Sequence, residues 1–434
     1  MSRGKIFVIL IALFSLTNEL VLSDSNYCYS DDEHPYLCAG TKTAYEVEHG
    51  LIKNTTVPNC KPVQIWMLIR HGTRYPGKNQ IKSMTHNLPK LQSSIIENHE
   101  KYGNGSLCQK DLEKLKTWKL DPNLNKDRSK YLTTQGEKDL SSLGARFKHY
   151  FPELLQSYPV DTLKQKYKFR STDLQRTIAS MENFINGLFG NVTTDNTVVV
   201  PTSKDTLLQP LFRYKILLHK ILNKFITRIS HYQRRLIDQL DLDDVIIMYT
   251  VCIFENAWNV NERSPWCAAF TKHQDELFEY EEDLYYYYHA GYGEKMSSAI
   301  GCPPLQDMFN HSSEEPQGIF YFTHSTALQL LLTTMGVAKD SVPLKASNFE
   351  DMRNRKWNSS RLAPFAANLA AIFYRCGSSN KVRFYLNEKP LDYEGCELGV
   401  CDWEYLKKKM GPNAFNSLMY LYLNIHFTHI YRPS

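Results

Sequence analysis

The chain has 434 residues, of which 42% are hydrophobic and 22% are charged. This composition is close to that of an average globular protein, and it excludes a disordered, collagenous or coiled-coil chain. Lys and Arg together number 51 against 46 Asp and Glu, a formal charge of +5. Spread over this length, that charge is too small to indicate a nucleic-acid partner. The length allows one large domain or two ordinary ones.

The first 23 residues predict a secretory signal peptide. Arg3 and Lys5 precede an apolar run from Ile6 to Leu16, and the small residue Ser23 follows. A charged start, a short apolar core and a small-residue exit are typical of a cleaved leader. The apolar run is about half as long as a membrane span. We therefore expect no transmembrane span in the mature chain, with an uncleaved anchor as the alternative.

Other features of the sequence favour the secretory pathway. All ten cysteines lie after residue 27, and an even number suits an oxidising compartment. The sequence does not fix their pairing, although Cys252 with Cys267, Cys28 with Cys38 and Cys396 with Cys401 are close enough to consider. Glycosylation sequons occur at Asn54, Asn104, Asn191, Asn310 and Asn358. The localisation we expect is secreted, luminal or surface-associated, and the apolar stretch 417–431 is expected to be a packed terminal helix rather than a lipid-anchor signal.

Short apolar runs predict the strands, taken in chain order. Residues 64–69 form such a run and end in a loop rich in Gly and Pro, which is typical of a buried strand. Residues 166–170 are a second candidate, followed by an expected helix over 173–188. Residues 318–323 are a third, followed by a helix over 327–335 that stops at Gly336. Residues 383–386 are a late strand before a turn. Strands that alternate with helices predict an α/β core.

Two long stretches, roughly 80–160 and 205–315, are expected to be mostly helical. The second contains an amphipathic basic segment from Arg213 to Arg235 and an acidic, Tyr-rich segment from Asp275 to His289. Helices with solvated charged faces are the simplest interpretation of both segments. Residues 24–434 are then one domain in which helical regions are inserted into the core.

Basic side chains follow the predicted strands at the points where ligands bind in open α/β sheets. His71 lies between Arg70 and Arg74 after the first strand, His324 follows the strand at 318–323, and Arg176 lies near the start of a helix after the strand at 166–170. Guanidinium groups bind phosphate oxygens in bidentate geometry, and nearby positive charge disfavours protonation of an imidazole. A neutral His71 is then a candidate nucleophile toward phosphorus, and a protonated His324 would be an additional donor. A structural role for an Arg-His pair in a loop is the alternative.

The sequence resembles the histidine acid phosphatase family. The segment Arg70-His71-Gly72-Thr73-Arg74-Tyr75-Pro76 is similar to the signature Arg-His-Gly-x-Arg-x-Pro of that family. Further similar segments are Leu132-Thr133-Thr134-Gln135-Gly136, Arg170-Ser171-Thr172-Asp173 with Arg176-Thr177, Ser264-Pro265-Trp266-Cys267, Glu281-Asp283-Leu284-Tyr286-Tyr287, Gly291-Tyr292-Gly293, Pro364-Ala366-Asn368-Leu369 and Leu386-Asn387-Glu388. They extend over roughly residues 60–410 and are most similar to the multiple inositol polyphosphate phosphatase branch.

The resemblance implies a phosphoglycerate-mutase-like mixed α/β core with an inserted, mostly α-helical subdomain. It also implies a phosphohistidine mechanism with no metal or other cofactor, and a small polyanionic phosphate as the substrate. Carried over by position, His71 is the nucleophile, while Arg70, Arg74, Arg176 and His324 hold the phosphate.

One position departs from the family pattern. In this branch the second histidine is normally followed by Ala-Glu, and in other branches by Asp, and that acid protonates the leaving alcohol. Here Ser325 and Thr326 follow His324. Loss of a general acid typically costs about 10²- to 10⁴-fold in rate, and a Thr326 hydroxyl is a poor substitute. A phosphatase with another proton donor, a slow phosphatase, and a non-catalytic phospholigand-binding protein with the same pocket are all compatible with this sequence.

Overall fold

A computed structural model describes residues 27–102, 107–191, 197–201, 205–209, 242–311, 316–396 and 399–415 of the chain. The predicted signal peptide, the sequon at Asn104, the basic segment 213–235 and the terminal stretch 417–431 lie outside the described residues.

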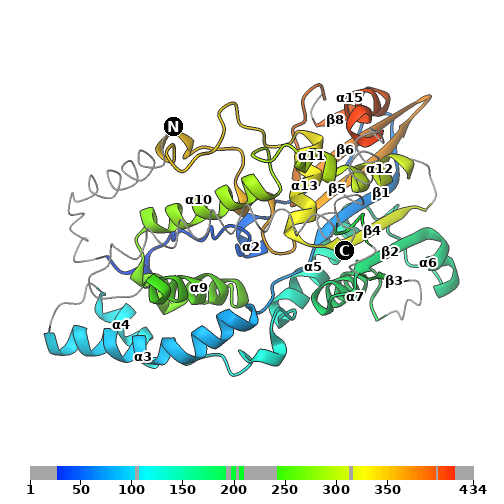
Figure 1. Cartoon of the computed structure of the whole chain (residues 1–434). Coiled ribbons are helices and arrows are strands. Elements are labelled where there is room, and N and C mark those ends of the chain that lie inside the picture. The colour runs from blue at the N-terminus through cyan, green and yellow to red at the C-terminus, as the bar shows by residue number, and fades with distance from the viewer. Residues whose placement is uncertain are drawn as a thin grey trace, which may run out of the picture.

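The described structure contains one mixed sheet of eight strands, which lies on the right of Figure 1. Its strands are β1 (Lys61–Arg70), β2 (Tyr167–Thr172), β3 (Thr197–Val200), β4 (Gly318–Thr323), β5 (Asn368–Cys376), β6 (Ser379–Leu386), β7 (Lys389–Pro390) and β8 (Val400–Asp402). The order is β3-β2-β4-β1-β5-β6-β7, and β8 also pairs with β6. The mixed α/β fold expected from the sequence is confirmed.

The parallel strands β1, β2 and β4 end at the same edge of the sheet. β4 pairs in parallel with both β1 and β2, and the register places Arg70 opposite Thr323. β5 runs antiparallel to β1 and starts at this edge, where Asn368 lies opposite Ile69. The residues that follow β1 and β4 are therefore neighbours, although more than 250 residues separate them in the sequence.

Helices cover both faces of the sheet, because residues along each central strand alternate between two cores. On β1, Ile65, Met67 and Ile69 face the core beneath α5 (Thr134–Tyr150) and α7 (Gln175–Phe189). Trp66 and Leu68 face the opposite core. That core is packed by α10 (Lys272–His289), α12 (Cys302–Asn310), α13 (Ser325–Met335) and α15 (Trp403–Phe415). Figure 1 shows α5 and α7 on one side of the sheet and α12, α13 and α15 on the other.

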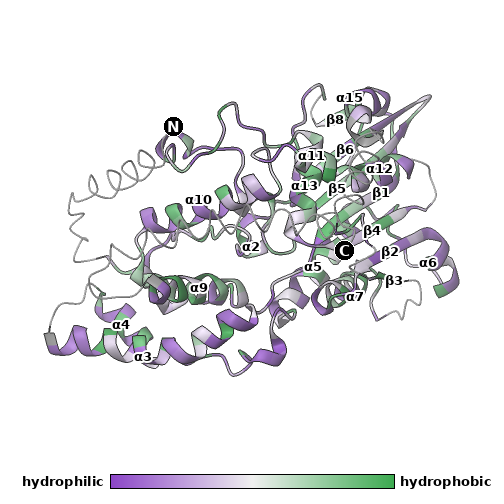
Figure 2. Cartoon of the chain, in the orientation of Figure 1, coloured by the Kyte–Doolittle hydropathy of each residue, from purple (hydrophilic) through white to green (hydrophobic). Residues whose placement is uncertain are grey.

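A separate helical region lies beside the sheet, on the left of Figure 1. It contains α3 (Lys78–Tyr102), α4 (Gln109–Thr117), α9 (Leu242–Trp258) and η5 (Pro265–Ala269), which share a hydrophobic core. These elements come from the segments between β1 and β2 and between β3 and β4. Figure 2 shows that α9 is hydrophobic along most of its length, which fits a helix buried in this core.

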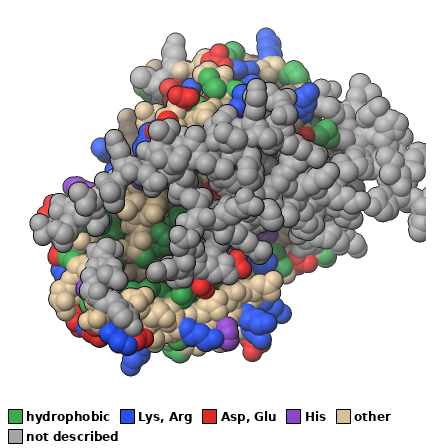
Figure 3. Space-filling view, turned by 60° about the vertical axis from the view of Figure 1, so that its left-hand side comes forward, with side chains coloured by type: hydrophobic (Ala, Val, Ile, Leu, Met, Phe, Trp, Pro, Cys, Tyr) green, Lys and Arg blue, Asp and Glu red, His purple; other side chains and the backbone are tan. Residues whose placement is uncertain are grey.

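Short elements connect these layers. They are η1 (Tyr29–Asp31), α2 (Tyr45–Glu48), η2 (Lys126–Arg128), α6 (Val160–Lys166), α11 (Ser297–Ile300), η6 (Glu350–Met352) and α14 (Ser359–Leu362). None of the helices within the described ranges is long and apolar enough to cross a membrane. On the face in Figure 3, the Lys and Arg side chains of the described residues are interspersed with Asp and Glu, in keeping with the small net charge.

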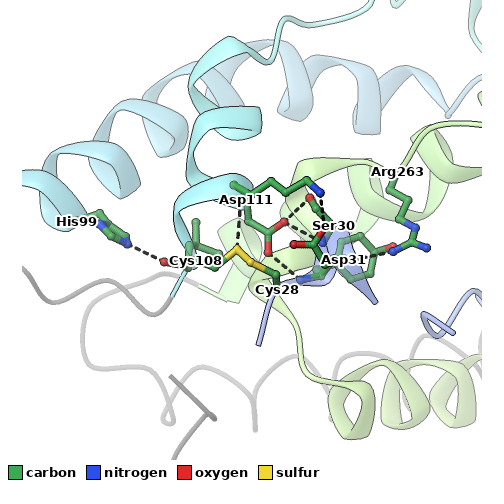
Figure 4. Close-up of a disulfide and its surroundings, with 10 residues drawn as sticks. Cys28, Ser30, Asp31, His99, Cys108, Asp111 and Arg263 are labelled. Atoms are coloured by element: carbon green, nitrogen blue, oxygen red, sulfur yellow. Dashed lines mark hydrogen bonds and ion pairs between the residues drawn. A yellow bond between two sulfur atoms is a disulfide. The ribbon is translucent and has the colours of Figure 1, made fainter. Parts of the chain in front are cut away.

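Four disulfides join the described segments: Cys28–Cys108, Cys60–Cys376, Cys252–Cys267 and Cys396–Cys401. The last two are pairs that short spacing suggested. The pair Cys28 with Cys38 was wrong, because Cys28 bonds to Cys108, 80 residues away. A disulfide over this span links η1 to the start of α4 (Figure 4).

Hydrogen bonds to Asp111 hold the same junction (Figure 4). Its carboxylate accepts bonds from the backbone N–H groups of Tyr29, at 2.8 Å, and Ser30, at 3.0 Å. The Arg263 guanidinium donates to the Tyr29 carbonyl at 2.7 Å. The Cys38 thiol lies nearby in sequence but is reduced and largely buried, and burial raises its pKa to about 12.

Candidate active site

Backbone hydrogen bonds to the segments on both sides fix the start of the loop after β1. The Arg70 N–H donates to the Ala367 carbonyl at 2.7 Å, and the His71 N–H donates to the Thr323 carbonyl at 3.0 Å. The His71 carbonyl accepts from the Ala366 N–H at 3.1 Å. Because three segments fix this backbone, the His71 side chain has a defined place at the sheet edge.

The His71 imidazole presents one nitrogen to the site. Its Nδ1 lies 2.8 Å from the Gly72 carbonyl oxygen. A carbonyl can only accept, so Nδ1 carries the proton and Nε2 keeps its lone pair. Burial and the charges of Arg176 and Arg70 hold the pKa of His71 well below its usual value. A buried, neutral imidazole with an available Nε2 has the properties of a nucleophile.

Two glycines allow the loop to approach α5. A Cβ on Gly136 would lie 2.2 Å from the Thr73 carbonyl oxygen, and one on Gly72 would lie 2.5 Å from the Gly136 carbonyl oxygen. The Thr133 hydroxyl caps α5 by accepting from the Gly136 N–H and also donates to the Thr73 carbonyl. The segment 132–136, which sequence comparison suggested only by resemblance, thus supports the His71 loop.

A carboxyl group inside α5 completes this support. Asp139 accepts from the Thr73 N–H at 3.0 Å and from the Thr73 hydroxyl at 2.7 Å. Burial raises the pKa of Asp139 to about 6, and these hydrogen bonds oppose the shift. These contacts give Thr73 a structural role in the loop.

Arg70 is held behind His71 by groups that sequence reasoning missed. Its Nη1 donates to the Thr41 carbonyl and to the Ala363 carbonyl at 2.7 Å, and its guanidinium lies 4.5 Å from the centre of the Phe365 ring. Backbone carbonyls from distant segments leave no sequence signal. Burial lowers the pKa of Arg70 to about 9, so this guanidinium remains charged at neutral pH.

The other two arginines share the same environment. Arg74 donates from Nη1 to the Tyr75 carbonyl at 2.7 Å and lies 5.7 Å from the Phe254 ring centre. Arg176, in the first turn of α7, has its pKa lowered to about 10 by burial and by the charge of Arg74. The Nε atoms of Arg70 and Arg176 are buried and make no hydrogen bond to any described residue. Clustered cations with unsatisfied buried donors favour an anionic ligand.

His324 lies across the site from His71. The two ring centres are 5.6 Å apart, and Arg176 Nη2 lies 3.5 Å from His324 Nδ1. Thr172 Oγ1 lies 3.3 Å from Nε2. Burial and the charges of Arg176 and Arg70 hold the pKa of His324 well below its usual value. The structure therefore brings all five predicted basic residues together, and His324 is neutral until an anion offsets the arginines.

The residues after His324 begin α13. The Ser325 side chain is buried, with its Oγ 3.3 Å from the Tyr286 hydroxyl oxygen, and Thr326 is half-buried. Tyr286 belongs to α10, which sequence analysis interpreted as a helix with a solvated face. Its side chain is half-buried and lies within electrostatic range of Arg70 and Arg74.

The sequons within the described residues differ in exposure. Asn54, Asn191 and Asn310 are exposed, whereas Asn358 is only 7% exposed. The Asn358 side chain caps α14 by accepting from the Arg361 N–H at 3.0 Å. Glycosylation at these positions stays a prediction, and the buried cap makes Asn358 the least accessible of the described four.

Comparison with known proteins agrees with this architecture. Residues 63–387 match the histidine phosphatase superfamily (branch 2). The chain is 35% identical to multiple inositol polyphosphate phosphatase 1 of Drosophila melanogaster, over 90% of this chain and 88% of that protein. Among solved structures, the phytase from D. castellii has a TM-score of 0.65 at 18% identity, over 87% of this chain and 84% of that one.

A second solved structure shares the fold. Multiple inositol polyphosphate phosphatase of Bifidobacterium longum, in complex with inositol hexasulfate, has a TM-score of 0.57 at 13% identity, over 87% of this chain and 98% of that one. The match over most of the chain shows that the protein belongs to the histidine phosphatase superfamily, branch 2, and is a phosphomonoesterase of the histidine acid phosphatase type.

Proposed function

We propose that the protein hydrolyses inositol polyphosphates or related phosphate monoesters through a phosphohistidine at His71. His71 Nε2 attacks the phosphorus while Arg70, Arg74 and Arg176 hold the non-bridging oxygens. The P–O bond to the alcohol breaks as the N–P bond forms, and water then hydrolyses the phosphohistidine to free phosphate.

The observation that carries this proposal is the state of the His71 ring. Its Nδ1 proton is committed to the Gly72 carbonyl, and its pKa is held well below the usual value by burial and nearby arginines. The same arginines stabilise the charge on the phosphoryl oxygens in the transition state. One cluster of cations therefore keeps the nucleophile unprotonated and binds the group that it attacks.

The relatives and the chemistry of the site support the substrate class. The Drosophila and Bifidobacterium relatives are named for inositol polyphosphates, which carry several phosphates on one ring. The buried Nε donors of Arg70 and Arg176, which no described residue satisfies, suit such a polyanion. We place the protein in the secretory pathway, because four disulfides suit an oxidising compartment.

Phosphate release tests the proposal. The purified protein should release phosphate from inositol hexakisphosphate and from an aryl phosphate between about pH 4 and 7.5, the range in which phosphate carries one to two charges. His71→Ala should abolish release from both while the protein remains folded by circular dichroism. A wild-type protein that is inactive on both substrates, or a fully active His71→Ala variant, would overturn it.

The absence of a carboxyl group at Ser325 and Thr326 favours one alternative, a non-catalytic phospholigand-binding protein. That protein would gain thermal stability from inositol hexakisphosphate and would release no phosphate. The assay above distinguishes the two functions.

A further inference from the structure

The leaving alcohol of a phosphate monoester must receive a proton, because an alkoxide is a poor leaving group. Ser325 and Thr326 occupy the two positions at which the family resemblance implies that acid, and both are aliphatic hydroxyls. Such a hydroxyl holds its proton about as strongly as the leaving alcohol does. It can pass a proton on, but it needs a stronger acid behind it.

The Tyr286 hydroxyl is placed to be that acid. It lies 3.3 Å from Ser325 Oγ, so the two hydroxyls form a hydrogen bond next to His324. Burial lowers the pKa of Arg70 and of Arg74, and a phenolate at Tyr286 would oppose this shift more than any other group. Tyr286 therefore lies close to two of the guanidinium groups that would hold the phosphate.

Two carboxyl groups near the site, Glu282 and Asp139, are committed elsewhere. Glu282 also interacts with Arg70 and Arg74, but its carboxylate pairs with Lys42 Nζ at 2.6 Å and accepts from the Thr41 N–H at 3.1 Å. An ion-paired carboxylate has no proton to donate. Asp139 is bonded to Thr73 and Gln135 behind the loop.

We propose that Tyr286 supplies the proton for the leaving alcohol by way of the Ser325 hydroxyl; this inference rests on the proposed function. As the ester P–O bond breaks, Ser325 passes its proton to the alcohol oxygen and takes one from Tyr286. The leaving group departs as a neutral alcohol, and Tyr286 remains as a phenolate. When water attacks the phosphohistidine, the proton that the water loses returns through Ser325 to Tyr286.

The electrostatics of the site suit this exchange. A phenol is a stronger acid than an aliphatic alcohol. The negative charge left on Tyr286 lies near the positive charges of Arg70 and Arg74. Tyr286 thus acts as a positioning and proton-relay residue, and Ser325 is the group that touches the substrate.

The dependence of rate on the leaving group isolates this role. Tyr286→Phe should lower kcat on inositol hexakisphosphate by about 10²-fold. It should leave kcat on p-nitrophenyl phosphate nearly unchanged, because p-nitrophenolate departs without protonation. Ser325→Ala should show the same selective loss. The matched control is Tyr288→Phe on the same helix, whose hydroxyl donates to the Leu344 carbonyl instead; it should leave both rates unchanged.

Each other outcome has a distinct meaning. Equal losses of Tyr286→Phe on both substrates would indicate a structural role, and no loss on either would indicate another donor, so either result overturns the inference. A wild-type protein that cleaves only the aryl substrate lacks a donor, which overturns the inference and leaves His71 as the nucleophile. A wild-type protein that cleaves neither overturns the proposed function and the inference with it.

Discussion

Replacing Thr326 by Glu places a carboxyl group where the resemblance to the histidine acid phosphatases implies an acid. Thr326 lies in the first turn of α13, two residues after His324, and is half-buried, so a longer side chain has an outlet to solvent. The first turn of a helix favours a negative side chain by about 0.3–1 kcal/mol. The substitution should therefore leave the fold intact.

The size of the gain depends on the donor already present. A general acid contributes about 10²- to 10⁴-fold, which corresponds to about 3–5 kcal/mol of barrier at 1.4 kcal/mol per tenfold. If Tyr286 and Ser325 already supply a proton, Thr326→Glu should raise kcat on inositol hexakisphosphate by only about tenfold, a small part of the range for a full general acid. In a Tyr286→Phe background the same change should restore most of the loss, about 10²-fold.

The pH dependence of the gain has a definite sign. The helix N-terminus and the arginine cluster both stabilise the ionised carboxylate, so the pKa of the introduced Glu lies below its ordinary value. Only the protonated form donates, and the gain should therefore increase as the pH falls from 6 to 4. Initial rates on alkyl and aryl phosphates, with Thr326→Gln as the uncharged control, measure it. A gain of the same size with Gln, or on the aryl substrate, would contradict proton donation by the introduced carboxyl group.

Three further predictions test the surroundings of the site. Burial and the nearby arginines lower the pKa of His71 and His324 below the value in the unfolded chain, so NMR titration should find both rings still neutral at pH values somewhat below 6.5. Their contribution to stability is complete above pH 6.5 and is lost as the pH falls below that value. Protonation of either ring near pH 6.5 would contradict this prediction. Gly136→Ala should lower the free energy of unfolding by at least about 2 kcal/mol and reduce activity, because the new Cβ would meet the Thr73 carbonyl. Gly77→Ala is the control: its nearest neighbours lie at 3.5 Å, so denaturant unfolding should find its stability unchanged. Glu388→Gln breaks a buried ion pair with Arg146 at 2.8 Å and should lower the free energy of unfolding by about 3 kcal/mol. Glu97→Gln, in the exposed ion pair with Lys101, should lower it by less than about 1 kcal/mol. Equal losses would be inconsistent with burial as the cause.

The sequence was sufficient to predict the sheet edge and the basic residues on it. β1 and β4 are continuous apolar runs, and such strands are buried on both faces and end in loops that carry function. The positions of Arg70, His71 and His324 followed directly from those ends. The strands β3, β5, β7 and β8 were not predicted, because they are short or lack a distinctive flanking motif.

Contacts between distant segments were beyond prediction for a physical reason. Thr41 and Ala363 hold Arg70 with backbone carbonyls, which every residue possesses, so no residue type marks them. The pairing of Cys28 with Cys108 depends on η1 lying against α4, which local spacing does not encode. In the sequence, Tyr286 was one of several tyrosines on a charged helix and part of a segment that resembles the family, and neither feature indicated a role. Its position beside Ser325 depends on the packing of α10 on α13.

The surroundings of the site disfavour positive charge on its own basic groups. Arg70, Arg74 and Arg176 all have their pKa values lowered, and both histidines are held neutral, because burial and mutual repulsion oppose positive charge there. A phosphate dianion removes that opposition, so it should raise the pKa of His324 more than that of any group outside the cluster. His324 would then gain its proton when the substrate arrives and not before. The protonated His324 expected from the sequence therefore belongs to the complex with phosphate. The neutral His71 that attack requires is already present in the free protein.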